Sequence, residues 1–218
     1  MRPGETLTYN GYEVCLFPFD WVECTQISGP GQYSHCCGTA SDWVGRTGSQ
    51  DPIYAPFSCS LIYSGTPANG NTRAYVSDSQ VWTPMGLSRI VVAFTHNNNP
   101  PSNLHFNQGD LIAHTGTAGN VTGDHCHLDQ CTGTTYTLVN SGIVCSGGST
   151  CWYLQDGWDP TFVYYLSGGE TIVDTLGQQF QTWTTAPGTF AKKLLLLTQN
   201  KRKKEGVNNA IHTLNIRL

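Results

Sequence analysis

Positively charged side chains are scarce in most of this sequence of 218 residues. Residues 1–191 contain four Arg, no Lys and fourteen acidic side chains, whereas residues 192–218 contain seven basic side chains and one acidic one. The formal charges of the two parts are therefore −10 and +6. An acidic body lacks the basic surface with which proteins bind nucleic acid. We expect no nucleic acid on the main domain, and a basic tail behind it.

Long hydrophobic runs are also missing. The first residues, Met1 to Gly4, lead into polar ones without the apolar stretch of a secretory signal. No later stretch approaches the ~18 apolar residues that a membrane-spanning helix needs. The sequence thus predicts neither export by an ordinary signal peptide nor a membrane span.

The nine cysteines include no C-x-x-C pair, which disfavours zinc-ribbon architectures. An odd number also leaves at least one unpaired thiol in a monomer. Cys145 and Cys151 are close enough in sequence to close a small loop. For most of the others we expect buried free thiols that pack as small hydrophobic side chains.

Strand-forming and turn-forming residues dominate the composition. The chain has 24 Gly, an aromatic content of 11% and 12% charged residues, and no long stretch has the 3.6-residue period of an amphipathic helix. Its length suffices for one all-β domain, alone or with an appendage. We predict a mainly β, globular protein.

Residues 89–96, Arg-Ile-Val-Val-Ala-Phe-Thr-His, form the clearest predicted strand. Its alternation predicts one buried face that carries Ile90, Val92 and Phe94 and ends in His96. A turn at 109–110 leads into a second strand at 111–114. Residues 66–88 are interpreted as a surface excursion.

Two groups of residues suggest metal chemistry. A turn-rich loop, 116–124, runs into His125 and His127, which share one face if this stretch is a strand. Earlier in the chain, a short glycine-containing loop separates His35 from Asp42, so these two side chains can converge. Neutral imidazole and carboxylate are both zinc ligands. Taken one at a time, the same residues also fit ordinary core, turn or surface roles.

The order of these segments resembles that of the M23, or lysostaphin-like, zinc peptidases over roughly residues 33–130. The most specific part is Gly109-Asp110-Leu111-Ile112 followed by Gly116-Thr117-Ala118-Gly119-Asn120-Val121-Thr122-Gly123-Asp124-His125-Cys126-His127. It is similar to the family's G-Q-x-I…G-x-x-G-x-S/T-G-x-H-x-H segment. The six residues between His35 and Asp42 exceed the usual three, and this longer spacing resembles that of bacteriophage tail peptidases and endolysins.

The resemblance implies a fold and a set of roles. The fold would be a small antiparallel β-sheet with long loops and a C-terminal extension, divided into an N-terminal segment (1–30), a peptidase domain (31–166) and the extension with its basic tail (167–218). Zinc ligands would be His35, Asp42 and His127, and the catalytic residues would be His96 and His125.

Neighbouring residues are interpreted from the same motif. Cys126 alternates to the opposite face and should pack in the core, while Asp129 shares the histidine face and can orient an imidazole. A structural zinc site that uses Cys36 and Cys37 is an alternative to the histidine site. The remaining histidines have no motif support and are taken as surface or structural residues: His105, His114 and His212.

The function that the resemblance implies is zinc-dependent hydrolysis of peptide bonds in bacterial peptidoglycan. We expect a component of a bacteriophage tail in the virion, where the basic tail docks on other tail proteins, acting on the bacterial cell wall. Two alternatives keep the fold: a phage endolysin released at host lysis, and a catalytically inactive structural tail-tip protein. A third, a disulfide-stapled carbohydrate-binding module, explains the cysteines and aromatics but not the five residues of the proposed site.

Overall fold

The structure is a computed structural model that describes residues 1–26, 41–132, 136–139, 142–145, 164–173 and 186–187. Within these residues it contains strands and one short 3₁₀ turn, and no α-helix. The elements are β1 (Thr8–Tyr9), β2 (Tyr12–Glu13), β3 (Trp21–Gln26), β4 (Ser41–Val44), β5 (Pro52–Tyr54), β6 (Cys59–Ser64), η1 (Pro67–Asn69), β7 (Arg73–Ser77), β8 (Val81–Thr83), β9 (Gly86–Ser88), β10 (Ile90–Thr95), β11 (His105–Phe106), β12 (Leu111–His114), β13 (Cys126–Thr132), β14 (Tyr136–Val139), β15 (Gly142–Cys145) and β16 (Thr171–Val173). The predicted mainly β fold is confirmed.

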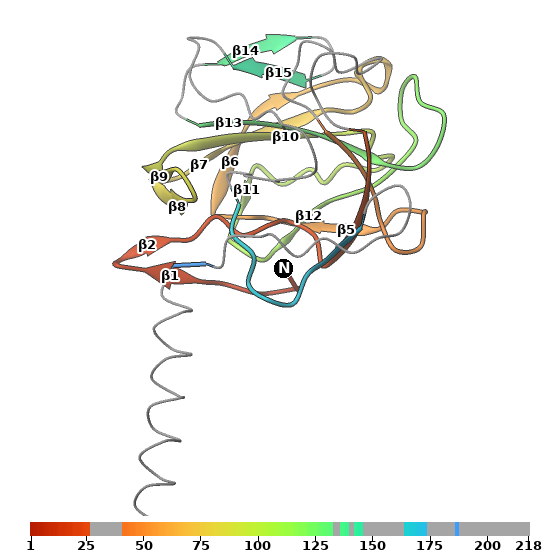
Figure 1. Ribbon diagram of the computed structural model, residues 1–218. Helices are drawn as coiled ribbons and strands as arrows, with labels where there is room; N and C mark the ends of the chain where they lie inside the picture. Colours follow the sequence, from red (N-terminus) through yellow and green to blue (C-terminus); the bar gives the residue numbers. More distant parts are fainter. Residues whose placement is uncertain (27–40, 133–135, 140–141, 146–163, 174–185, 188–218) are drawn as a thin grey trace, which may run out of the picture.

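One sheet of eight strands organises the molecule, in the order β11-β6-β7-β10-β13-β4-β3-β16. Its strand pairs are antiparallel, as predicted, except for the parallel pair β3 and β16. Figure 1 shows β6, β7, β10 and β13 side by side, with β5 and β12 below them. The predicted N-terminal segment supplies β3, and the predicted extension supplies β16.

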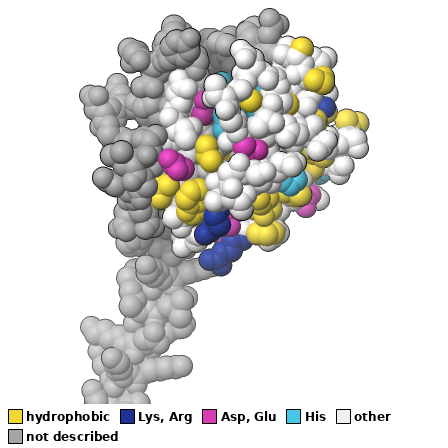
Figure 2. Space-filling view, turned by 90° about the vertical axis from the view of Figure 1, so that its right-hand side faces the viewer, with side chains coloured by type: hydrophobic (Ala, Val, Ile, Leu, Met, Phe, Trp, Pro, Cys, Tyr) yellow, Lys and Arg dark blue, Asp and Glu magenta, His cyan; other side chains and the backbone are white. Residues whose placement is uncertain are grey.

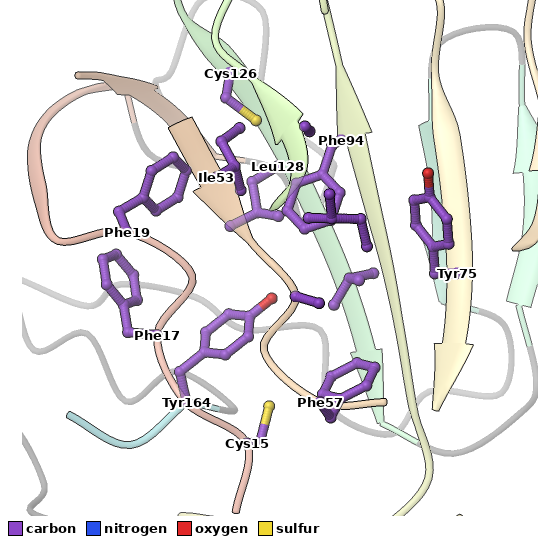
Figure 3. Close-up of a cluster of buried hydrophobic side chains, with 14 of the residues drawn as sticks. Cys15, Phe17, Phe19, Ile53, Phe57, Tyr75, Phe94, Cys126, Leu128 and Tyr164 are labelled. Atoms are coloured by element: carbon purple, nitrogen blue, oxygen red, sulfur yellow. The ribbon is translucent and has the colours of Figure 1, made fainter. Parts of the chain in front are cut away.

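The central strand β10 is buried along its whole length. Ile90, Val92 and Phe94 face the main core, whereas Val91 and Ala93 pack with a smaller cluster on the other face of the sheet. In Figure 3, Ile53, Leu128 and Phe94 lie together in this core with Phe57 below them, and Phe17, Phe19 and Tyr164 line its left side. The strand that the sequence predicted at 89–96 is thus confirmed over 90–95.

The interpretation of residues 66–88 as a surface excursion is wrong. Residues 73–77 form β7, which lies between β6 and β10 in the sheet. Tyr75 and Ala74 are fully buried, on opposite faces. The strand pairs with β10 from Val76↔Val91 to Arg73↔Phe94. Turns on both sides and a mixed composition hid this strand in the sequence.

Four cysteines are buried free thiols, as expected: Cys15, Cys24, Cys59 and Cys126. Burial raises the pKa of each of these thiols, which keeps them protonated. Cys131 is disulfide-bonded. The suggested Cys145–Cys151 loop involves a residue outside the described part of the chain. In the described part of the chain, no helix has the length and apolar character needed to cross a membrane.

Candidate active site

Asp42 and His127 face each other across two neighbouring strands. In the register of β4 and β13 they are direct partners, and Nδ1 of His127 lies 3.1 Å from Oδ1 of Asp42. On the other side of β13, His127 pairs with Thr95 at the end of β10. Directly opposite residues of antiparallel strands project from the same face of the sheet. The register of three strands therefore fixes the position of this pair.

His125, the residue directly before β13, also lies beside Asp42 and His127. A two-way backbone bridge with Gly116 holds it, with both N–H···O distances at 3.0 Å. Its Nδ1 lies 2.9 Å from the Gly123 carbonyl, which can only accept, so Nδ1 carries the proton. Its Nε2 points toward the pair and lies 3.7 Å from Oδ1 of Asp42. The predicted sharing of one face by His125 and His127 is confirmed.

The ring of His96 also lies beside this pair, in an orientation that the sequence did not predict. Phe94 faces the core, so a regular strand would place His96 on the core side too. The strand instead ends at Thr95, and His96 adopts φ +81°, in the left-handed region. The expectation that His96 ends the buried face is therefore wrong, because this backbone turn swings the ring to the other side. Its ring centroid lies 4.6 Å from that of His125 and 5.9 Å from that of His127.

The protonation of His96 follows from its surroundings. Nδ1 lies 2.7 Å from the carbonyl of Ala118 and must donate to it, which leaves Nε2 with a free lone pair. Burial, together with the rings of His125 and His127, lowers the pKa of His96 to about 4, although the Ala118 carbonyl acts in the opposite direction. At neutral pH His96 is uncharged and can accept a proton at Nε2.

Asp129 lies behind His127 on the same strand and is buried. Its Oδ2 is 3.5 Å from Nε2 of His127, so one ring nitrogen of His127 faces each carboxylate. Burial alone lowers the pKa of His127, but Asp129 and Asp42 outweigh burial and raise it to about 10 in the metal-free chain. Cys126, between the two histidines, packs in the core on the opposite face, as predicted.

Four of the five predicted site residues thus lie together: Asp42, His96, His125 and His127. The fifth, His35, and the competing thiols of Cys36 and Cys37 lie outside the described residues. In the part that is described, no three His, Cys, Asp or Glu side chains form a complete metal site. On the surface in Figure 2, histidine side chains appear next to carboxylates, and few basic side chains are visible.

The donor set of Asp42 and His127 fits zinc. Tetrahedral ligand atoms 2.0–2.1 Å from zinc lie roughly 3.3 Å apart. Nδ1 of His127 and Oδ1 of Asp42 are 3.1 Å apart, which is close to that value. Nε2–H of His127 can donate a hydrogen bond to the carboxylate of Asp129, and this tautomer leaves Nδ1 with its lone pair toward Asp42. A carboxylate behind a ligating imidazole is the usual outer partner of a zinc site.

Two further histidines lie elsewhere. His105 on β11 is half exposed and pairs with Asp78, at 2.7 Å from Nε2 to Oδ2. His114 is on β12, away from the sheet that carries the site. The surface reading of His105 is confirmed, and His212 is outside the described residues.

Sequence reasoning missed the residues that hold His96. These are Gly70 and Asn71, in a turn between β6 and β7, and the carbonyl of Ala118. The only signal in the sequence was the consecutive pair of turn formers Gly70-Asn71, both of which have positive φ.

The chain matches no family model. In sequence it is similar to Morphogenesis protein 1 of Bacillus phage B103, with 31% identity over 129 residues. The match covers 58% of this chain and 34% of that protein, so the chain spans about a third of the length of this curated relative.

In structure the chain resembles solved M23 peptidases. The catalytic domain of the prophage-encoded M23 protein EnpA from Enterococcus faecalis gives a TM-score of 0.41 at 16% identity, covering 57% of this chain and 88% of that one. The catalytic domain of lysostaphin from Staphylococcus simulans gives 0.37 at 16% identity, covering 55% and 83%. A zinc-containing peptidase from Vibrio cholerae gives 0.38 at 15% identity, covering 63% and 44%. These superpositions cover 55–63% of this chain.

Proposed function

We propose that this chain is a zinc-dependent endopeptidase that hydrolyses peptide bonds in bacterial peptidoglycan, and that it acts as part of a bacteriophage tail. The observation that carries the proposal is the convergence of Asp42, His96, His125 and His127 on one face of the sheet. Four residues from three separate segments meet there, although none of them is needed to fill the core.

We assign zinc binding to His35, Asp42 and His127. Bound zinc would supply a Lewis acid that polarises a peptide carbonyl and lowers the pKa of water toward ~7. Asp129 holds the ring of His127 in the orientation that directs Nδ1 toward Asp42. The single carboxylate ligand and two neutral imidazoles would leave one position free for water or substrate.

His96 and His125 are assigned to proton transfer and charge stabilisation. Nε2 of His96 has a free lone pair at neutral pH, so His96 can take the proton of the attacking water. In its protonated form His125 carries N–H groups at both ring nitrogens, one toward Gly123 and the other toward the reaction site. That second N–H can donate to the oxygen on which negative charge develops.

The phage setting rests on the relative. Because the similar protein of Bacillus phage B103 is called a morphogenesis protein, we favour a part of the phage particle over an endolysin released at lysis. The basic residues 192–218 would attach the chain to other tail proteins or to an anionic wall, since the remainder carries the opposite charge. We also propose that the chain divides into an N-terminal segment (1–30), a peptidase domain (31–166) and a C-terminal extension (167–218).

Digestion of purified bacterial walls tests this function. Fragments that carry new amino termini, and that disappear when zinc is chelated, are expected. Released sugars without new amino termini would point to glycan cleavage, and intact walls with bound protein would point to a carbohydrate-binding module.

A further inference from the structure

Two segments, the turn that contains Gly70 and the loop that contains Gly116 and Ala118, hold both the backbone and the ring of His96. The carbonyl of Gly70 accepts the N–H of His96 at 2.7 Å. From the other side, the N–H of Ala118 donates to the carbonyl of His96 at 3.0 Å, and the carbonyl of Ala118 accepts from Nδ1 at 2.7 Å. Gly116 allows this close approach, because a Cβ there would lie 2.2 Å from the oxygen of His96. The ring has little freedom while these segments stay in place.

The backbone of His96 does not hold this conformation by itself. A φ of +81° is unfavourable for a residue with a Cβ, and it persists only where the surrounding structure imposes it. The chain must therefore be fixed on both sides of His96. Before it, the sheet fixes Thr95; after it, residues 97–99 lie outside any strand.

Asn71 supplies the restraint after His96. Its side chain is buried, and Nδ2 lies 3.0 Å from the carbonyl of Asn97 and 3.4 Å from that of Asn98. The side-chain oxygen of Asn98 in turn accepts from the backbone N–H and the hydroxyl of Thr117, at 3.0 and 3.2 Å. One carboxamide thus links the turn before β7 to the chain after His96, and through it to the loop that contains Ala118.

We propose that Asn71 is a positioning residue for His96: it anchors the carbonyls of Asn97 and Asn98 and so directs the imidazole of His96 toward His125 and His127. The side-chain hydrogen bonds of Asn71 go to the carbonyls of Asn97 and Asn98 and not to a histidine ring, so its effect on His96 runs through the chain at 97–98. The catalytic meaning of this role rests on the proposed function, whereas the geometric role does not.

A buried carboxamide that bridges two carbonyls can also be purely structural, and the chain contains such a group. Gln108 is buried, and its Nε2 lies 2.6 Å from the carbonyl of Val14 and 2.9 Å from that of Pro56. None of its hydrogen-bond partners belongs to the segments that hold His96. Gln108→Glu therefore removes the same kind of interaction as Asn71→Asp without touching His96, and serves as the matched control.

The test compares Asn71→Gly, Asn71→Asp and Gln108→Glu in the full chain loaded with zinc. Glycine keeps the left-handed backbone of residue 71, at φ +53°, and adds no charge. We expect both Asn71 variants to lower kcat on a wall-peptide substrate about 10- to 100-fold with little change in KM or zinc content, because small misplacements of a catalytic group cost that much. Gln108→Glu should retain the kcat of the wild type.

A double-mutant comparison shows whether the loss goes through His96. In a His96→Ala background, Asn71→Gly should change the residual rate less than about twofold, because the group that it positions is gone. An equal fold-loss in both backgrounds would overturn the proposal.

A second readout does not depend on hydrolysis. In ¹⁵N-resolved NMR spectra of the imidazoles, His96 should have its proton on Nδ1 in the wild type and in Gln108→Glu, and a mixture of the two tautomers in Asn71→Gly. An unchanged His96 signal in Asn71→Gly would contradict the proposal even if the chain proves to be no peptidase. If both Asn71 variants fail to fold while Gln108→Glu folds, Asn71 is a structural residue and the proposal is wrong.

Discussion

Nδ1 of His127 and Oδ1 of Asp42 lie 3.1 Å apart, although the two residues are 85 positions apart in the sequence. Strand register brings them together, since they are direct partners between β13 and β4. A carboxylate and an imidazole nitrogen that face each other at this distance can share a proton or a cation.

The first prediction concerns metal content. The purified chain should hold about one zinc, and His127→Ala or His35→Ala should abolish retention, because each removes one of three protein ligands. His105→Ala is the control, since it removes a histidine that also pairs with an aspartate, far from the site in the sheet order. Elemental analysis after dialysis measures the outcome. Full loading of both histidine variants, with loss of metal on Cys36→Ser, would place the metal on the thiols.

The second prediction separates binding from catalysis. His96→Ala and His125→Ala should retain zinc and the fold but lose hydrolysis by ~10²–10⁴-fold, the usual cost of removing a proton-transfer group or an oxyanion donor. Rates on a wall peptide, together with metal content and melting temperature, measure it. Near-normal rates for both variants would refute the assigned roles.

The third prediction concerns Asp129, which faces Nε2 of His127. Asp129→Asn should weaken zinc binding about 10- to 100-fold, as expected when a ligating histidine loses its carboxylate partner. Asp78→Asn makes the same change beside His105 and should leave zinc binding unaltered. Competition with a chelator gives both affinities. Equal affinities in Asp129→Asn and wild type would show that Asp129 does not orient the ligand.

The fourth prediction is a pH dependence of zinc binding. The pKa of His127 in the metal-free chain is raised to about 10, so below that pH zinc must displace a proton. Apparent affinity should therefore increase with pH, by about tenfold per unit for one displaced proton. The stability of the metal-free fold should instead decrease with pH. Stabilisation by the protonated ring of His127 is complete below the ordinary pKa of 6.5 and is lost as pH rises toward 10. A zinc affinity that is flat between about pH 6 and pH 8 would contradict this.

The sequence was informative where alternation and motif order determine position. The strand at 90–95, the core placement of Cys126 and the common face of His125 and His127 follow from the two-residue period of strands. The proximity of Asp42 to His127 did not follow from any local pattern, because it depends on which strands pair. It came from the resemblance instead.

Two features escaped prediction for physical reasons. β7 is short, and its small, aromatic and charged residues carry no clear alternation, yet pairing with β6 and β10 buries it. The orientation of His96 depends on a single left-handed residue, which contacts from Gly70 and Ala118 impose. Tertiary contacts of this kind leave no periodic signal in a sequence.

The central claim is that the residues gathered around His127 form a zinc site that cleaves wall peptides. The most direct measurement is the rate at which the full chain releases new amino termini from purified peptidoglycan after removal of metal and stepwise return of zinc. We predict no activity without metal, recovery that saturates at about one zinc per chain, and no recovery in His127→Ala. Activity that persists in the metal-free chain, or that returns equally in His127→Ala, would contradict the account.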